Sequence, residues 1–297
     1  MAQKPKILVI VGPTASGKSD LAVLLAKKFN GEVISADSRQ VYRGMDIGTG
    51  KVTKREMAGV PHHLLDVASP KQVYAVSHFK HDGEEALKAI FQRGKLPIIC
   101  GGTGFYISAL IDDLLLPEVP PNMMLRKRLE QKTAVELFAM LKKIDPARAK
   151  TIDAQNPHRL VRAIEIAQAL GKVPALKRKS PYNPLVIGIL VPQDKLRERI
   201  HLRLKKRMRT GMIAEAKRLH EGGLSWRRME ALGLEYKYLA LYLQKKLTKT
   251  AMLAELEKEI VHYAKRQMTW FNKDKRVNWI HRDEKMAVGL VKQFLNQ

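Results

Sequence analysis

A glycine-rich run that contains a lysine and a hydroxyl side chain stands near the start of the chain. It matches the phosphate-loop pattern G-x-x-x-x-G-K-[ST], and an apolar run precedes it while a helical pattern follows. Backbone N–H groups and a helix N-terminus would then face one anion. Lys18 can reach the outer phosphate, and the Ser19 hydroxyl can ligate Mg²⁺. The predicted diphosphate- or nucleotide-binding residues are Gly12, Pro13, Thr14, Ala15, Ser16, Gly17, Lys18 and Ser19.

Two further junctions carry side chains that can do chemistry. Asp37-Ser38-Arg39-Gln40 follows an apolar run, and Thr103 lies in a second glycine-rich turn after another such run. The carboxyl ends of strands in an open parallel sheet line one crevice, so both junctions are expected beside the phosphate loop. Asp37 can hold Mg²⁺ or accept a proton from a nucleophile. A turn or helix-capping role remains open for this aspartate.

Short β-branched runs alternate with helical patterns along the chain. The runs are almost continuously apolar, which is typical of strands buried on both faces of a parallel sheet. The alternation predicts an α/β fold: a P-loop NTPase-like parallel sheet with flanking helices. Strands are expected at 7–11, 33–36, 96–100, 186–191 and 277–280, and helices at 19–29, 76–92, 194–209, 212–221 and 249–271.

The stretch 117–184 shows only helical patterns, and prolines stand at both of its ends. Asn122 and Asn156 are predicted to be helix N-caps, and Pro157 would occupy a first helical position. Gly171 is predicted to be a C-cap. We therefore expect a catalytic core formed by 1–116 and 185–297, with an all-helical insertion domain at 117–184.

The net charge of the chain indicates which class of partner it binds. The 297 residues include 54 Lys and Arg against 29 Asp and Glu, which gives a formal charge of +25. Such an excess favours a polyanionic partner, above all nucleic acid. With a single cysteine, Cys100, no intramolecular disulfide can form. No apolar run is long enough for a membrane span, and no signal peptide is recognised, so a cytoplasmic protein is expected.

Motifs in order along nearly the whole chain resemble the bacterial tRNA dimethylallyltransferase family, which are tRNA isopentenyltransferases. Jointly these motifs are highly specific, although only the phosphate loop is persuasive alone. They are GPTASGKS at 12–19, DSRQVYRGMDIGTGK at 37–51, PHHLLD at 61–66, GGTGFY at 101–106, NPHRLVRAIEI at 156–166, the basic helix with Arg199 and Arg203, LGLEYK at 232–237 and AKRQMTWF at 264–271.

The resemblance implies alkyl transfer from dimethylallyl diphosphate to N6 of adenosine 37, beside the anticodon of tRNA, with release of diphosphate. Asp37 would be the base that takes the amine proton. Lys18, Arg203 and Mg²⁺ on Ser19 would stabilise the charge that develops on the leaving diphosphate. Thr14 would touch a phosphate oxygen or align the amine. The implied catalytic residues are Asp37, Thr14, Lys18 and Arg203.

The resemblance also implies that the anticodon stem-loop of tRNA is a partner and that the target base is turned out of its stack. A single chain is expected to act as a monomer. From spacing alone, Arg159 and Arg162 share one helix face, whose usual role is a solvated surface. The residues expected to contact tRNA are Asp37, Ser38, Arg39, Gln40, Thr103, Arg126, His158, Arg159, Leu160, Val161 and Arg162.

Three other functions remain open from the residues. A small-molecule P-loop kinase that uses ATP explains the phosphate loop but not the charge of +25. A nucleic-acid-binding NTPase explains both of these features, yet the chain has no clear Walker B run apart from the segment that ends at Asp37. An isopentenyltransferase that acts on free adenine nucleotides would need no basic insertion. Whether ATP binds is therefore left open.

Overall fold

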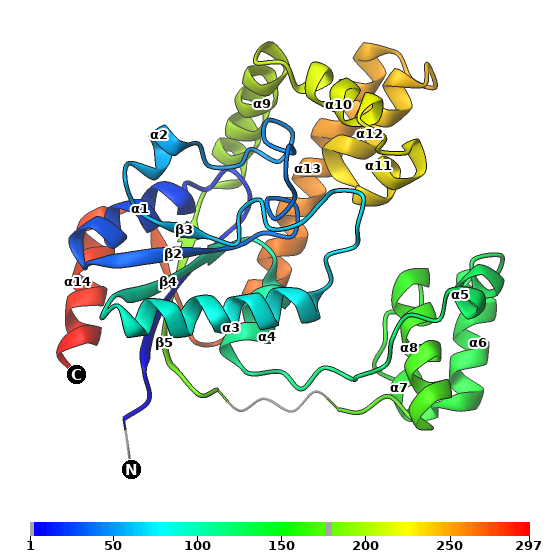
Figure 1. The fold of residues 1–297 in the computed structure, drawn as a ribbon, viewed down its shortest axis with the longest axis horizontal. Helices are drawn as coiled ribbons and strands as arrows, with labels where there is room; N and C mark the ends of the chain where they lie inside the picture. The colour runs from blue at the N-terminus through cyan, green and yellow to red at the C-terminus, as the bar shows by residue number, and fades with distance from the viewer. Residues whose placement is uncertain (1–2, 176–179) are drawn as a thin grey trace. The chain divides into compact units, whose positions relative to one another are not determined.

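A six-stranded, all-parallel sheet forms the centre of the computed structural model, which describes residues 3–175 and 180–297 (Figure 1). The strand order is β3-β2-β4-β1-β5-β6. The predicted P-loop NTPase-like α/β class is confirmed. The strands are β1 (Lys6–Val11), β2 (Gly31–Ala36), β3 (His62–His63), β4 (Leu96–Gly101), β5 (Asn183–Leu190) and β6 (Val277–His281).

Strand β1 lies near the middle of this sheet. It pairs with β4 on one side and β5 on the other, so that Leu8 lies opposite both Ile98 and Leu185. Its apolar residues from Ile7 to Ile10 are fully buried. The five predicted strands are confirmed to within a few residues at their ends. The two-residue strand β3 was missed because a pair of histidines carries no apolar or alternating pattern.

Helices cover both faces of the sheet. On one face, α1 (Lys18–Lys28) and α14 (Glu284–Asn296) bury side chains such as Leu25 and Val291 against the strands. On the other face, α3 (Val76–Gln92) and α4 (Gly104–Ile111) contribute Phe79 and Ile107 to a second core. Burial on both faces explains why the strands are almost continuously apolar.

A group of helices follows β5 and has a core of its own, which includes Met45, Tyr236 and Leu256. The predicted helices at 212–221 and 249–271 have those bounds, and the one predicted at 194–209 begins one residue earlier. The remaining short helices of this group and of the loop before β3 were not predicted. The elements are α2 (Lys54–Met57), α9 (Gln193–Arg209), α10 (Met212–Glu221), α11 (Trp226–Leu232), α12 (Leu234–Leu243) and α13 (Lys249–Phe271).

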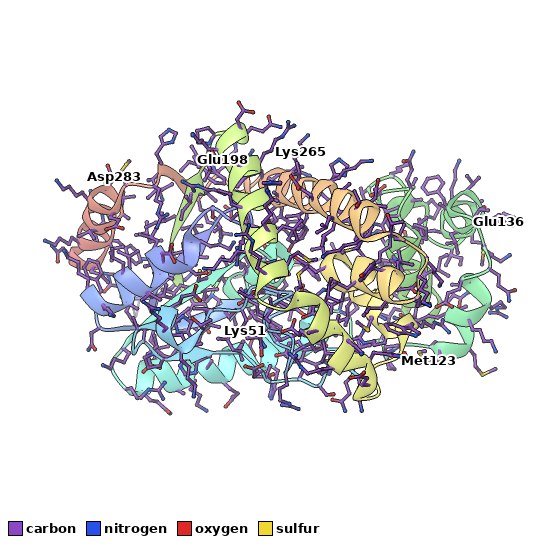
Figure 2. All side chains as sticks on the ribbon, turned by 90° about the horizontal axis from the view of Figure 1, so that it is seen from above. Lys51, Met123, Glu136, Glu198, Lys265 and Asp283 are labelled. Carbon is purple, nitrogen blue, oxygen red and sulfur yellow. The ribbon has the colours of Figure 1, made fainter. Side chains whose placement is uncertain are left out.

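A second compact unit, purely helical, begins at Leu114 and ends before Ser180. Its helices have the predicted caps: the Asn122 and Asn156 side chains accept hydrogen bonds from the first turns of α5 and α8, and Gly171 ends α8 with φ 79°. Glu136, which is labelled in Figure 2, closes a capping box with Thr133 at the start of α6. The elements are α5 (Met123–Leu129), α6 (Ala134–Ile144), α7 (Pro146–Ala149) and α8 (Pro157–Leu170).

This helical unit buries leucines and isoleucines from α5, α6 and α8, among them Leu129, Leu141 and Ile164. Its bounds differ by a few residues from the insertion expected at 117–184. The first segment of the other unit ends at Asp113, before the first of the prolines that set the expected boundary. In neither described range is any helix long and apolar enough to cross a bilayer.

Candidate active site

The phosphate loop connects β1 to α1. Gly17, with φ 92°, is the left-handed residue just before the helix, a conformation that favours glycine. The Ser16 side chain is fully buried, and its hydroxyl has no hydrogen-bond partner among the described residues. The sequence therefore builds the predicted strand–loop–helix, with the N-terminus of α1 open to an anion.

Lys18 begins α1 and turns its amine back over the loop, where Nζ donates to the Pro13 carbonyl at 3.2 Å. Removal of this amine from water lowers the pKa of Lys18, as does nearby Arg203, whereas the Asp37 carboxylate acts in the opposite direction. A bound anion would favour the charged amine and so oppose the effect of burial. The lysine is thus placed to meet a negatively charged ligand.

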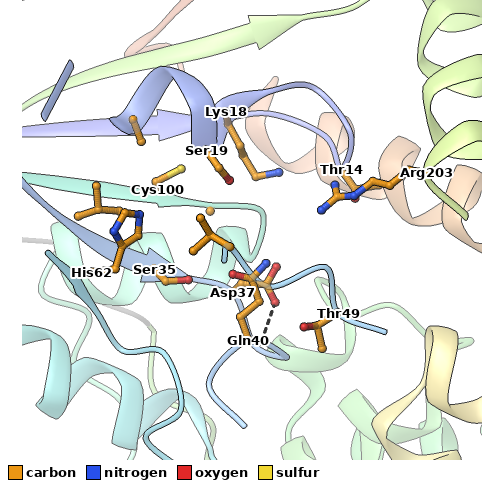
Figure 3. A pocket seen from close by; sticks show the side chains of 14 residues that line it. Thr14, Lys18, Ser19, Ser35, Asp37, Gln40, Thr49, His62, Cys100 and Arg203 are labelled. Carbon is orange, nitrogen blue, oxygen red and sulfur yellow. Dashed lines mark hydrogen bonds between the residues drawn. The ribbon is translucent and has the colours of Figure 1, made fainter. Parts of the chain in front are cut away.

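Asp37 follows the last residue of β2 and faces the same cavity as Lys18 (Figure 3). Its Oδ1 accepts hydrogen bonds from the backbone N–H groups of Arg39, at 2.8 Å, and Gln40, at 3.3 Å. The turn-capping role that the sequence left open is therefore real. Within the described residues, no hydrogen bond engages the second oxygen, Oδ2, so the turn fixes the carboxylate and leaves one oxygen for chemistry.

Thr103 links the turn after β4 to the turn after β2. Its Oγ1 accepts a hydrogen bond from the Ser38 N–H at 3.0 Å, and its own N–H donates to Ala36 at 3.1 Å. Burial raises the pKa of Tyr263, on α13, so its hydroxyl stays protonated. The structure thus brings together the two junctions that the sequence placed at one crevice.

A cavity of about 50 Å³ separates the phosphate loop from the Asp37 turn. A wider cleft of about 630 Å³ shares four of its lining residues, which are Lys18, Ser19, Val52 and Arg203. Both openings are therefore framed by basic groups and by the start of α1. Further cations along the cleft are Arg199, Lys206, Arg207 and Arg282, and the small cavity is also lined by Thr14, Asp37, Gln40 and Thr49.

Arg203 projects from α9 toward the cavity (Figure 3). Its neighbours on the same helix face are Arg199, one turn before, and Arg207, one turn after. Burial and the positive charge of Arg207 lower the pKa of Arg203 to about 10. Its guanidinium donates to the Gly50 carbonyl at 3.1 Å, a neutral acceptor that leaves the positive charge uncancelled.

Gln267 is a site residue that sequence reasoning missed. On α13, its Oε1 accepts from the Thr14 N–H at 2.8 Å, and its Nε2 donates to the Gly102 carbonyl at 3.0 Å. A Cβ at Gly102 would lie 2.0 Å from that Nε2, so glycine is needed there for the contact. A buried glutamine on an apolar helix face was the available signal. It joins the phosphate loop to the turn after β4.

The described residues contain no group of three or more His, Cys, Asp or Glu side chains that could hold a metal ion. Mg²⁺, however, keeps several waters and takes only one or two protein oxygens besides phosphate. The Ser19 hydroxyl and the Asp37 carboxylate are such hard oxygen donors, and both line the small cavity. The residues present therefore fit Mg²⁺ delivered with a diphosphate.

The residues of the helical unit that were predicted to contact tRNA differ in exposure and in their partners. Arg126 and Arg162 both bind the carboxylate of Glu165, whose side chain is 1% exposed, and Arg162 also donates to the Val119 carbonyl. Of the two arginines predicted to share a helix face, Arg162 is thus held by contacts with the fold. Leu160 is fully buried in the core of the unit, so its side chain has no access to RNA. His158 and Arg159 are exposed, and Val161 is half-buried.

A parallel sheet with a phosphate loop after its first strand, and with lysine, arginine and carboxylate around one cavity, defines a P-loop NTPase-like enzyme. The chain belongs to the IPP transferase family, whose model matches residues 40–274. A model described as isopentenyl transferase matches residues 5–72. The family predicted from the motifs is confirmed.

Relatives and solved structures agree with this assignment. The chain is 43% identical to tRNA dimethylallyltransferase 1 of Syntrophus aciditrophicus, over 95% of either chain. It is 41% identical to the tRNA dimethylallyltransferase of Anoxybacillus flavithermus, over 92% of this chain and 89% of the relative.

Among solved structures, the tRNA isopentenylpyrophosphate transferase of Bacillus halodurans is 38% identical, with a TM-score of 0.75 and coverage of 99% of this chain and 96% of that one. A eukaryotic dimethylallyltransferase acting on tRNA is 25% identical, with a TM-score of 0.85, over 98% of this chain and 80% of that chain. Homology thus extends over nearly the whole chain.

Proposed function

We propose that this protein is a tRNA dimethylallyltransferase, which transfers a dimethylallyl group from dimethylallyl diphosphate to N6 of adenosine 37 and releases diphosphate. The observation that carries the proposal is the placement of Asp37 across one small cavity from Lys18 and Ser19. A base and a diphosphate-binding loop on two sides of one space are what alkyl transfer to an amine requires. The tRNA acceptor is supported by the names of the relatives and by the charge of +25.

The diphosphate end of the donor binds at the phosphate loop. The N–H groups at the start of α1, the Lys18 amine and the Arg203 guanidinium face it. As the C1–O bond of the donor breaks, negative charge gathers on the diphosphate, and these groups stabilise it without having to move. Thr14, whose backbone N–H is held by Gln267, lines the same cavity and contacts a phosphate oxygen.

Asp37 acts as the general base. The N6 lone pair is delocalised into the adenine ring, so the amine must lose a proton as its bond to C1 forms. That proton passes to Oδ2 of Asp37, while the electron pair of the broken C1–O bond leaves with the diphosphate. The two N–H bonds to Oδ1 hold the carboxylate in place for this step.

Ser19 and Asp37 would hold Mg²⁺, and the bound ion would neutralise charge on the diphosphate oxygens. The proton transfer described above uses only the carboxylate. Because Oδ2 serves the amine in that step, we assign the Ser19 hydroxyl as the principal protein ligand.

RNA binding involves both units. Four residues lie beside the general base Asp37 and are placed to bind the extruded adenine. They are Ser38, Arg39, Gln40 and Thr103. In the helical unit, the exposed His158 and Arg159 are assigned to backbone phosphates. Three further residues contact RNA only through the part of each side chain that the fold leaves exposed. They are Arg126, Val161 and Arg162.

The test uses dimethylallyl diphosphate labelled in its alkyl group, bulk tRNA, and ATP labelled in its γ-phosphate, each supplied alone and in pairs. The expected result is label in tRNA with one diphosphate released per group transferred, and only when donor and tRNA are both present. A matched tRNA transcript with guanosine at position 37 should accept no label. Transfer of the γ-phosphate of ATP, or alkylation of free adenine nucleotides instead of tRNA, would overturn the proposal.

A further inference from the structure

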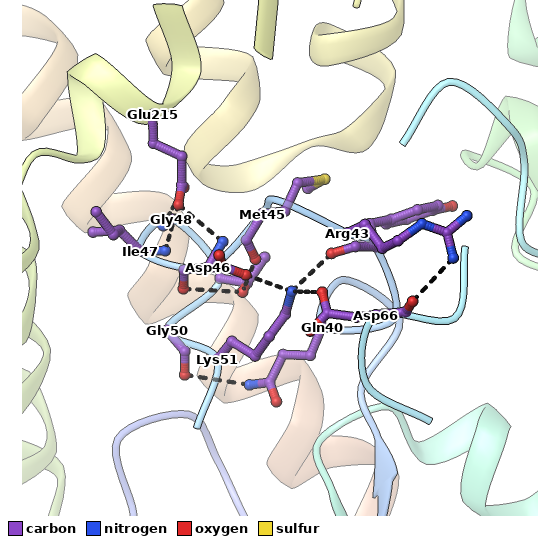
Figure 4. A network of polar contacts seen from close by, with 12 residues as sticks. Gln40, Arg43, Met45, Asp46, Ile47, Gly48, Gly50, Lys51, Asp66 and Glu215 are labelled. Atoms are coloured by element: carbon purple, nitrogen blue, oxygen red, sulfur yellow. Dashed lines mark hydrogen bonds and ion pairs between the residues drawn. The ribbon is translucent and has the colours of Figure 1, made fainter. Parts of the chain in front are cut away.

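A carboxylate buried inside the fold holds the loop 46–51. Glu215, on α10, is 3% exposed. Its Oε2 accepts from the backbone N–H groups of Asp46 at 2.9 Å and Ile47 at 2.7 Å, and its Oε1 accepts from Gly48 at 2.9 Å (Figure 4). Successive N–H groups that converge in this way form a nest for an anion. Here the protein supplies the anion itself.

Tyr236 completes the set of donors around this carboxylate. Its hydroxyl donates to Oε1 of Glu215 at 2.7 Å. Burial, together with the Glu215 charge, raises the pKa of Tyr236 well above its usual range, so the hydroxyl stays a donor. A Cβ at Gly48 would stand 2.7 Å from the tyrosine oxygen, so only glycine lets the loop lie this close. All four donors are therefore fixed in place.

The carbonyl groups of the same loop hold active-site side chains. The Gly48 carbonyl accepts from Arg207 at 3.0 Å, and the Gly50 carbonyl accepts from Arg203 at 3.1 Å. The Gly50 carbonyl also accepts from Nε2 of Gln40 at 3.4 Å (Figure 4). One backbone oxygen thus contacts a side chain assigned to the diphosphate and another assigned to the RNA base.

The far end of the loop is secured independently. Lys51 is 8% exposed, and its Nζ lies 2.8 Å from the Tyr42 carbonyl, 2.6 Å from Asp46 and 2.5 Å from Asp66. With the lysine at one end and the Glu215 carboxylate on its N–H groups, the loop has little freedom to turn its peptide planes. The directions of its carbonyls are therefore set by contacts outside the cavity.

We propose that Glu215 is a positioning residue for the transfer reaction. It fixes the N–H groups of 46–48, which sets the carbonyls of 48–50 and, through the Gly50 carbonyl, the places of Arg203 and Gln40. The inference rests on the proposed function for its readout, because Arg203 is taken to face the diphosphate. Glu215 lines neither the small cavity nor the wider cleft, so its effect on transfer must pass through the loop.

The first test is Glu215→Gln. A glutamine keeps the size but places an NH₂ group where an oxygen accepts hydrogen bonds, so at least one loop N–H faces a donor. We expect the single-turnover rate to fall about tenfold or more, and the KM for dimethylallyl diphosphate to rise, as Arg203 loses its place.

The matched control is Tyr236→Phe, which removes one hydrogen bond from the same carboxylate and leaves the three loop bonds intact. We expect a comparable loss of thermal stability but a rate within about threefold of the wild type. Equal rate losses in the two variants, after correction for the folded fraction, would show that Glu215 only supports the fold.

A double-mutant cycle with Arg203→Ala decides whether the effect passes through that arginine. In the Arg203→Ala background, Glu215→Gln should cost much less than it does alone, because only its effect through Gln40 remains. Fully additive losses would overturn the proposal. If Glu215→Gln prevents folding, Glu215→Asp replaces it in the double-mutant cycle. Aspartate keeps the charge but is shorter by one methylene, so its carboxylate lies farther from the loop.

Binding of inorganic pyrophosphate, measured by calorimetry, separates this inference from the proposed function. Should the wild-type protein transfer no alkyl group, the proposed function fails. A non-additive loss of pyrophosphate affinity in the same cycle would still support the positioning role, and an additive loss would overturn it.

Discussion

Arginines in the two units look alike in the sequence but differ in what holds them. In the cavity, the Arg203 guanidinium donates a hydrogen bond to a backbone carbonyl, that of Gly50. Burial lowers the pKa of Arg203 to about 10. In the helical unit, Arg126 and Arg162 form ion pairs with the carboxylate of Glu165. A cation held by neutral groups stays available to an anionic ligand, whereas one paired with a buried carboxylate serves the fold.

The contrast separates two kinds of outcome. Changes around the cavity should reduce the rate and leave the free energy of unfolding almost unchanged, because the groups there are placed for a ligand. Changes around Glu165 should reduce stability first.

The largest effect is expected at Asp37. Asp37→Asn keeps the shape and removes the charge, so the single-turnover rate should fall by roughly 10²–10⁴ if the carboxylate is the base. Affinity for tRNA should remain nearly unchanged. The control is Asp194→Asn, an exposed aspartate of the same unit.

The same variant distinguishes other roles of Asp37. Weaker binding of dimethylallyl diphosphate with partial rescue at high Mg²⁺ would make it a metal ligand. A normal single-turnover rate with lower stability would reduce it to the turn cap that its Oδ1 contacts describe.

Lys18→Ala should cost about 10² or more in rate, because the developing diphosphate charge loses a cation placed beside it. Lys28→Ala, at the exposed end of α1, removes an equal charge far along the helix and should change the rate little. Single-turnover measurements at saturating tRNA make the comparison. A Lys18 variant within a few fold of the wild type would mean that the loop does not bind the reacting diphosphate.

The sequence predicted the residues that line the cavity better than the residues that hold the surrounding loops in place. The phosphate loop, Asp37 and Thr103 follow buried strands, and parallel strand ends meet by topology, so their meeting could be foreseen. Gln267 and Glu215 bind backbone groups more than 160 residues away in the sequence. A polar residue on an apolar helix face marks such a side chain, but it does not indicate which backbone groups the side chain will bind. Such contacts become visible only when helices pack.

In the helical unit, caps were predictable and charge partners were not. Asn122 and Asn156 cap helices through local contacts, three residues along the chain. Arg126 reaches Glu165 from another helix, which spacing along the sequence cannot indicate. Leu160 falls within a family motif, yet helical periodicity places it in the core. A motif thus groups residues that the fold separates into surface and interior.

Glu165→Gln should lower the free energy of unfolding at neutral pH by about 2 kcal/mol, because two arginines lose a charged acceptor. Burial alone would raise the pKa of Glu165, yet hydrogen bonds from Arg126 and Arg162 hold it below its ordinary value. Its stabilisation is therefore present above the unfolded pKa of about 4.3 and is lost as pH falls through the lower folded pKa.

Urea unfolding at several pH values checks this prediction. The gap between wild type and Glu165→Gln should be largest near neutral pH and shrink in acid. The control is Glu118→Gln, an exposed carboxylate of the same unit. A gap that stays constant down to acid pH would mean that the lost charge is not the cause.

The smallest effect concerns Arg159, whose side chain is 59% exposed and lies 3.9 Å from its nearest carboxylate, Asp153. If it contacts an RNA phosphate, Arg159→Ala should reduce the slope of log affinity against log salt by about one. Arg162→Ala removes the same charge from a residue held by Glu165, so it should lower stability and leave the slope almost unchanged. Binding of an anticodon stem-loop RNA between about 50 and 200 mM salt measures both slopes. Equal losses of slope in the two variants would contradict the division between exposed arginines and arginines held by a buried carboxylate, since Arg162 would then leave Glu165 for the RNA.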